Sequence, residues 1–173
     1  MVGNWNTKVI YKVTEKYTWS VPATIDFGEN AGPESQTRVV EANLKTGNGT
    51  AAGATNGTAP KVMVTENVIG VGKKLQITID TDHTDNGKFY VETPENTKTG
   101  LSQTKYEKLY FKIEKNDTNK TELTKDKNEV LSVDSGTNTA EQELVFTLTT
   151  TSDTAEKAGD YVGYAVFHSQ LVV

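Results

Sequence analysis

The sequence predicts an all-β protein that folds as a single β-sandwich. Short runs in which apolar and polar residues alternate recur along all 173 residues, and a period of two is typical of half-buried strands. Turn-forming Gly, Asn and Asp separate these runs, and no stretch has the period of an amphipathic helix. With turn signals roughly every 8–12 residues, we expect about ten strands in one sandwich domain over residues 1–173.

In the first half of the chain, apolar residues at spacing two mark each strand. Tyr17, Trp19 and Val21 alternate with polar neighbours. Pro22 ends this run, at a position where the sheet does not need the N–H that proline lacks. Gly70 and Gly72 place a turn before the next alternation. The predicted strands are, in order, Val9–Val13, Tyr17–Val21, one that starts at Val39–Val40, Val62–Ile69 and Leu75–Ile79.

In the second half, the clearest turn is Asp85-Asn86-Gly87, because an Asn-Gly step tolerates positive φ. The apolar residues of the run that begins at Leu109 alternate with Lys, as expected for a strand with one buried and one solvent-exposed face. The chain ends in a nearly continuous strand. The predicted strands here are Phe89–Val91, Leu109–Ile113, Val130–Val133, Leu144–Leu148 and Tyr161–Val173.

Two polar segments interrupt this rhythm. Residues 43–60 are rich in Gly, Ala, Thr and Asn, a composition that buries too little apolar surface to order itself, so we expect a long, flexible, exposed loop. Residues 115–128 are dense in Lys, Asp, Asn and Thr and are interpreted as a polar hairpin tip. Both segments are expected to face solvent.

Composition limits the classes of partner. The 18 basic and 23 acidic residues are interspersed and give a net charge of −5, so there is no basic stripe of the kind that nucleic acid requires. No apolar run approaches the roughly 20 residues that span a bilayer, and we expect no membrane insertion. With no cysteine, stability has to come from packing and sheet pairing. The N-terminal residues have no signal-peptide pattern.

Three motifs resemble one known family. They are YTWSVPATIDFG at Tyr17–Gly28, GKKLQITI at Gly72–Ile79 and AGDYVGYAVF at Ala158–Phe167. In this order they are similar to a β-sandwich module of surface proteins from Gram-positive, Firmicutes-type bacteria. The resemblance covers nearly the whole chain, and each motif is mostly strand and turn chemistry. It implies an Ig-like or jelly-roll-type sandwich with an extracellular, non-catalytic role.

The only candidate cofactor is calcium, and the candidate metal ligands are Asp80, Asp82 and Asp85, which gather carboxylate oxygens near a glycine. The match to a calcium-binding EF-hand loop fails, because the position of the last carboxylate falls on Val91. A solvated hairpin is the alternative reading. The two histidines, one in this turn and one in the final strand, are expected to be exposed, since a metal or acid-base site with both would require the fold to bring them together.

Aromatic residues have two competing interpretations. Trp5 and Tyr11, together with Tyr17 and Trp19, could form a platform for sugar rings, so Trp5 and Tyr11 are candidate ligand contacts. Core packing is the alternative for Trp19, since it shares one sheet face with Tyr17. We expect the core to contain Trp19, Phe111, Phe146 and Phe167.

No nucleophile elbow, phosphate-binding glycine loop or cysteine chemistry is found in the sequence, which favours a protein that is not an enzyme. We expect a structural protein on the surface of a phage virion, such as a capsid decoration, head-fibre or tail-associated subunit. Its partners would be other protein subunits, and host-surface glycans are a further possibility. The alternative is an adhesion module of a bacterial cell surface or pilus, extracellular or in the cell wall, that binds carbohydrate.

Overall fold

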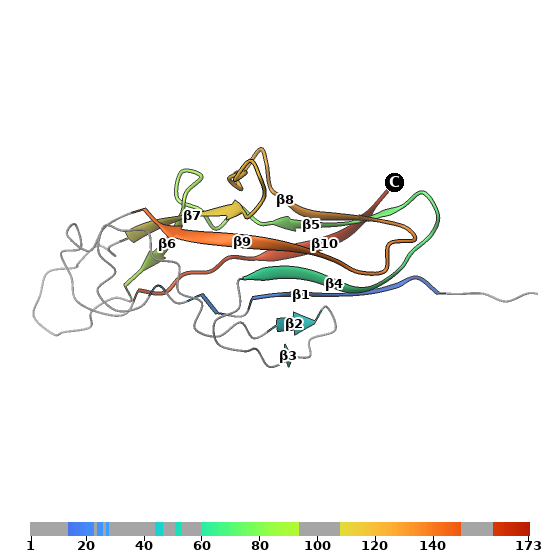
Figure 1. Cartoon of the computed structure of the whole chain (residues 1–173). Helices are drawn as coiled ribbons and strands as arrows, with labels where there is room; N and C mark the ends of the chain where they lie inside the picture. The colour runs from blue at the N-terminus through green and yellow to red at the C-terminus, as the bar shows by residue number, and fades with distance from the viewer. Residues whose placement is uncertain are drawn as a thin grey trace, which may run out of the picture.

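The computed structural model describes residues 14–22, 24–25, 27, 44–46, 51–52, 60–93, 108–149 and 161–173. The described residues form antiparallel sheets without any helix (Figure 1). The all-β architecture is therefore as predicted. Trp5, Tyr11 and the predicted strands Val9–Val13 and Val39–Val40 lie outside the described residues.

A seven-stranded sheet with the order β3-β2-β1-β4-β9-β7-β6 forms one layer. Its register is antiparallel throughout, and one irregularity lies between Thr18 and Trp19, where β1 runs along β4. Its strands are β1 (Lys16–Val21), β2 (Leu44–Thr46), β3 (Ala51–Ala52), β4 (Lys61–Val68), β6 (Phe89–Glu92), β7 (Lys108–Lys115) and β9 (Ala140–Leu148).

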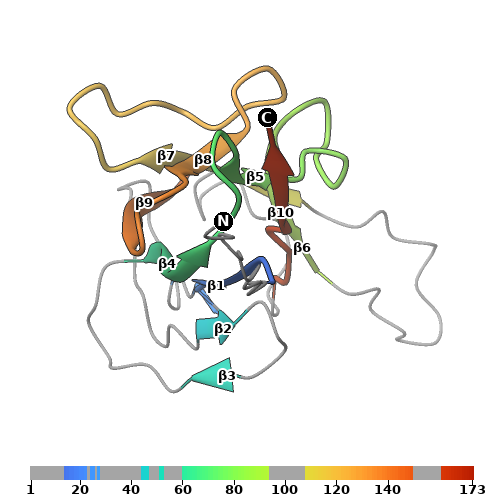
Figure 2. The same cartoon turned by 90° about the vertical axis from the view of Figure 1, so that its right-hand side faces the viewer.

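A three-stranded sheet with the order β10-β5-β8 forms the other layer. Its strands are β5 (Lys74–Ile79), β8 (Glu129–Asp134) and β10 (Phe167–Val172). Viewed along the strands, β10, β5 and β8 lie on one side of the molecule, and β1, β2 and β4 lie on the other (Figure 2). The opening and closing strands thus belong to different sheets.

The segment before β10 connects the two sheets. Val162 and Glu92 exchange two main-chain hydrogen bonds of 2.9 and 3.0 Å, which join this segment to the end of β6. The Asp80 N–H then donates to the Val166 carbonyl at 2.7 Å, and β10 continues along β5. The predicted continuous strand Tyr161–Val173 is therefore a bridge in one sheet followed by a full strand in the other.

The core lies between the two sheets because alternate side chains of each strand point inward. Phe111 and Phe146 are among the buried residues, as predicted, with exposed fractions of 7% and 2%. Trp19 and Phe167 are only partly buried and pack against the border of the core. The remaining buried apolar side chains are Val62, Val64, Leu75, Ile77, Ile79, Phe89, Leu109, Ile113, Leu123, Val130, Val133 and Leu144.

Of the predicted loop over residues 43–60, the structure describes residues 44–46, 51–52 and 60, and it places the short strands β2 and β3 there. The rest of the segment lies outside the described residues. Val21 pairs with Lys45 of β2, and β2 pairs with β3. A composition poor in apolar residues does not prevent this, because main-chain groups make the ladder. Besides these two short strands, the described residues form eight strands of four residues or more, against about ten expected from turn spacing.

The polar segment 115–128 also differs from a simple hairpin tip, because the strands on either side of it lie in different sheets. Its first part does fold back, since the Lys115 N–H donates to the Thr121 carbonyl at 2.8 Å. The Leu123 N–H then bonds the Ile113 carbonyl at 2.8 Å. The Leu123 side chain, only 2% exposed, anchors the segment in the core.

Candidate functional site

The turn after β5 brings together both histidines of the chain at one carboxylate. Asp80 Oδ2 lies 3.4 Å from His83 Nδ1 and 3.5 Å from His168 Nε2. The Asp82 N–H donates to Asp80 Oδ1 at 2.7 Å and fixes the carboxylate. These contacts hold the pKa of Asp80 below its ordinary value, chiefly through the Asp82 N–H and further through His168 and His83.

Both histidine side chains are exposed as predicted, at 64% and 60%, and the fold brings both of them to the same carboxylate. Their meeting depends on the pairing of β10 with β5, which sets His168 opposite Thr78. Such long-range register leaves no mark in either local sequence.

Asp85 makes a separate cluster on the outer face of β6 and β7. Its Oδ2 accepts hydrogen bonds from the Tyr110 hydroxyl at 2.9 Å and from Lys108 Nζ at 3.2 Å. Lys108 Nζ also lies 4.3 Å from the centre of the Tyr90 ring, within range of a cation–π contact. The hydrogen bond from Tyr110 is the main cause that lowers the pKa of Asp85, and Lys108 contributes to it.

The calcium candidates thus have different partners. Asp80 faces the histidines, whereas Asp85 faces β7. Asp82 contacts Asp80 through its main-chain N–H, which donates to Asp80 Oδ1. Across the described ranges, no group of three or more His, Cys, Asp or Glu side chains is arranged to hold a metal ion.

The Asp85 cluster gives a prediction for the phenol of Tyr110. Its hydrogen bond to Asp85 raises the pKa of Tyr110, because loss of the proton would set two negative charges side by side. The hydrogen bond is intact below this raised pKa and is lost as pH rises through it. In Asp85→Asn the phenol should titrate closer to the ordinary tyrosine value of about 10.

The measurement is the ultraviolet absorbance of tyrosinate during alkaline titration. The matched variant Tyr110→Phe isolates this phenol by difference from the other tyrosines, both with Asp85 and with Asn at that position. An unchanged titration of Tyr110 in Asp85→Asn would contradict the assigned cause.

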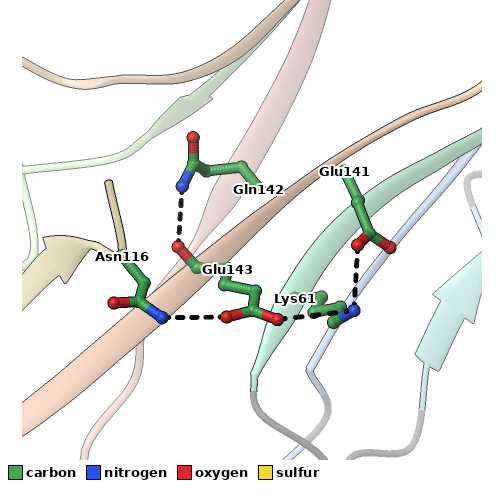
Figure 3. A network of polar contacts seen from close by, with 5 residues as sticks. All are labelled: Lys61, Asn116, Glu141, Gln142 and Glu143. Atoms are coloured by element: carbon green, nitrogen blue, oxygen red, sulfur yellow. Dashed lines mark hydrogen bonds and ion pairs between the residues drawn. The ribbon is translucent and has the colours of Figure 1, made fainter. Parts of the chain in front are cut away.

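A third polar network crosses from β4 to β9 and to Asn116 in the polar segment 115–128 (Figure 3). Lys61 Nζ lies 2.9 Å from Glu141 Oε1 and 3.5 Å from Glu143 Oε1. Asn116 Nδ2 donates to the other oxygen of Glu143 at 2.8 Å. Gln142 Nε2 donates to the Glu143 carbonyl at 2.8 Å. The Asn116 amide, followed by Lys61, lowers the pKa of Glu143. This exposed network links the neighbouring strands β4 and β9 to Asn116, the residue that follows β7.

An open groove of about 370 Å³ lies between β1 and β10. Tyr17 and Trp19 line it from the inner side of β1. Both aromatic side chains are partly buried and also pack against the core. The other lining residues are Glu15, Lys16, Thr18, Glu66 and Ser169. The sequence left two interpretations of Trp19, core packing and ligand contact. In the structure the Trp19 side chain packs against the core and also lines the groove.

Beside this groove, β10 is an edge strand of the three-stranded sheet. It pairs with β5 over its whole length, and in the described part of the chain no strand pairs with its other side. Exposed apolar side chains accompany this terminal segment, with exposed fractions of 52% for Val162, 73% for Tyr164 and 106% for Val173. These side chains flank β10 in sequence, and Val162 itself pairs with Glu92 of β6. Exposed apolar groups and an edge strand are each typical of a surface that contacts another protein.

Comparisons of the chain with protein-family models, with curated proteins and with solved structures give no match. Among the described residues, no helix has the length and apolar character needed to cross a membrane.

Proposed function

We propose that this protein is a non-catalytic, surface-exposed structural module that assembles into a larger array, as a structural protein of a phage virion. The single observation that supports this proposal best is the outer edge of β10, with which no other described strand pairs, in a terminal segment that also exposes Val162, Tyr164 and Val173. A strand edge offers main-chain donors and acceptors to a neighbouring subunit. Repeated copies on a scaffold convert such modest contacts into strong attachment.

We assign the sandwich to the Ig-like class of extracellular modules. The shared core between two antiparallel sheets supports this assignment, as does the terminal segment that leaves one sheet at Val162 and enters the other at Phe167. Capsid decorations, head fibres and tail-associated subunits are the virion roles that suit such a module. Its partners are other protein subunits, and its location is the virion surface.

A second function, adhesion at a bacterial cell surface or pilus, is favoured by the groove at Tyr17 and Trp19. Aromatic side chains beside the carboxylates of Glu15 and Glu66 suit contacts with sugar rings and hydroxyl groups. In this case the location is extracellular or in the cell wall, and the ligand is a host-surface glycan.

Immunogold labelling and mass spectrometry of purified virions and of purified cell walls test the two functions. We expect the intact protein at a fixed copy number per virion, and absent from walls of uninfected cells. Detection only in cell walls would overturn the virion role and support adhesion. Detection of a free monomer alone, with neither particle labelled, would overturn assembly itself.

A further inference from the structure

The β10 edge lacks the features that usually protect a sheet edge from pairing with another chain. In natural proteins, the edge strands of sheets carry Lys, Pro, inward-pointing charged residues or β-bulges, which prevent pairing with another chain. The sequence of β10 is FHSQLV, without Lys, Arg, Asp, Glu or Pro, and its register with β5 has no irregularity. The opposite edge of the same sheet, β8, begins with Glu129, ends with Asp134 and pairs irregularly with β5.

The hydrogen bonds of β10 identify the main-chain groups that face outward. Opposite residues in an antiparallel pair alternate between exchanging hydrogen bonds and pointing away from each other. The Asp80 N–H donates to the Val166 carbonyl. The main-chain groups of His168 and Gln170, two and four residues further along, therefore also point toward β5. The N–H and C=O groups of Phe167, Ser169 and Leu171 therefore lie on the free edge.

We propose that β10 pairs antiparallel with β10 of a second copy of this chain, with Ser169 of each copy at the two-fold axis. The proposal rests on the proposed function and names the partner for its free edge. This register uses every outward-facing residue of both strands and forms about six main-chain hydrogen bonds. It joins the two three-stranded sheets into one continuous sheet, and a two-fold pair of this kind is self-complementary.

Side chains on the inner face of β10 suit this register. Phe167 of one copy stands opposite the partner's Leu171, and the two serines, which are small, meet at the axis. Val173, fully exposed in the single chain, stands opposite the partner's Ala165. Cross-strand apolar pairs of this type stabilise sheets. The added strand also extends the smaller sheet beside the groove at Tyr17 and Trp19.

The contact is small, because one strand pair buries less than the roughly 1,000 Å² expected of a stable interface. We therefore expect a weak dimer in dilute solution. When neighbouring copies are held on one particle, the same contact becomes effectively intramolecular and persists. A weak, self-complementary edge suits a decoration or fibre subunit better than a tight, permanent dimer does.

A single engineered cysteine tests the register, since the chain has no cysteine of its own. In the proposed pair the two Ser169 Cα atoms are about 5.5 Å apart, within the range of a disulfide. Under mild oxidation, the full-length variant Ser169→Cys should form disulfide-linked dimers. The matched control Gln170→Cys, which lies beside it on the exposed face, should crosslink at least tenfold more slowly, because the two Gln170 residues would be diagonal neighbours about 7–8 Å apart, beyond the usual reach of a disulfide.

Ser169→Pro provides a second measurement. It removes an N–H that faces outward and leaves the hydrogen bonds to β5 in place, so the fold should persist, as proline is tolerated on sheet edges. Sedimentation at rising protein concentration should show association of the wild type and its loss in Ser169→Pro.

Equal crosslinking of the two cysteine variants, or a wild-type monomer at every concentration, would overturn the β10 pair. If virion labelling persists despite that result, only the partner of the edge is wrong. If labelling also fails, the proposed function is wrong.

Discussion

Replacing Phe111 with Ala is expected to lower the free energy of unfolding by about 3–5 kcal/mol, the usual cost of deleting a buried aromatic ring. Phe111 is 7% exposed and lies at the centre of an aromatic cluster. Its ring centre is 5.7 Å from Phe27, 5.7 Å from Phe89 and 6.3 Å from Phe146. The substitution therefore removes contacts on several sides, and the sheets on either side cannot collapse to fill the space.

Urea unfolding of wild type, Phe111→Ala and Phe111→Leu measures this effect. The conservative Leu variant should lose less than about 1.5 kcal/mol, since most of the apolar volume remains. Phe167→Ala is the second control, because it deletes the same side chain at a position that is only partly buried. The sequence predicts that Trp19, Phe111, Phe146 and Phe167 are all core residues, with losses of about 3–5 kcal/mol each. The structure predicts smaller losses for Trp19 and Phe167, which are only partly buried. Equal losses for Phe111→Ala and Phe167→Ala would contradict the observed core.

The second large effect is expected at Gly163. A Cβ atom there would lie 2.2 Å from the Tyr90 carbonyl oxygen and 3.1 Å from the Val91 Cα. These are main-chain atoms of β6, so neither can move without displacing the strand. We expect Gly163→Ala to separate the terminal segment from β6, to weaken the paired hydrogen bonds between Val162 and Glu92, and to cost about 1–3 kcal/mol.

Gly70→Ala is the matched control for Gly163→Ala. A Cβ at Gly70 would meet Glu15 Oε1 at 2.8 Å, but that atom ends a flexible, exposed side chain that can turn away. Its expected cost is within about 0.5 kcal/mol. Thermal unfolding of both variants gives the comparison, and amide hydrogen exchange at Val162 locates the loss. Rapid exchange confined to this segment in Gly163→Ala is the expected signature. Wild-type melting and exchange in Gly163→Ala would show that the close approach to β6 is not required.

Much of the fold follows from local sequence. The alternation in Leu75–Ile79 and in Leu109–Ile113 predicts both the strands and their inward residues, because successive side chains of a strand must point to opposite faces. The turn before β6 follows in the same way. Asn86 and Gly87 have φ values of 52° and 80°, a conformation that few other residue types adopt readily.

Only the tertiary structure decides which strands are neighbours and what their pairing brings together. Local alternation is the same whichever partner a strand takes, so it does not set β10 against β5 or make β10 the outermost of the described strands in its sheet. For this reason the contact of His168 with Asp80, 88 positions apart in the chain, could not be predicted. The same holds for the need for glycine at Gly163, which a carbonyl of β6 imposes. The sequence by itself determined most of the longer described strands and the faces they bury, because these depend on neighbours along the chain, but not the short strands β2 and β3. Long-range register determined the polar clusters, the groove and the free edge, because these depend on residues that meet only after folding.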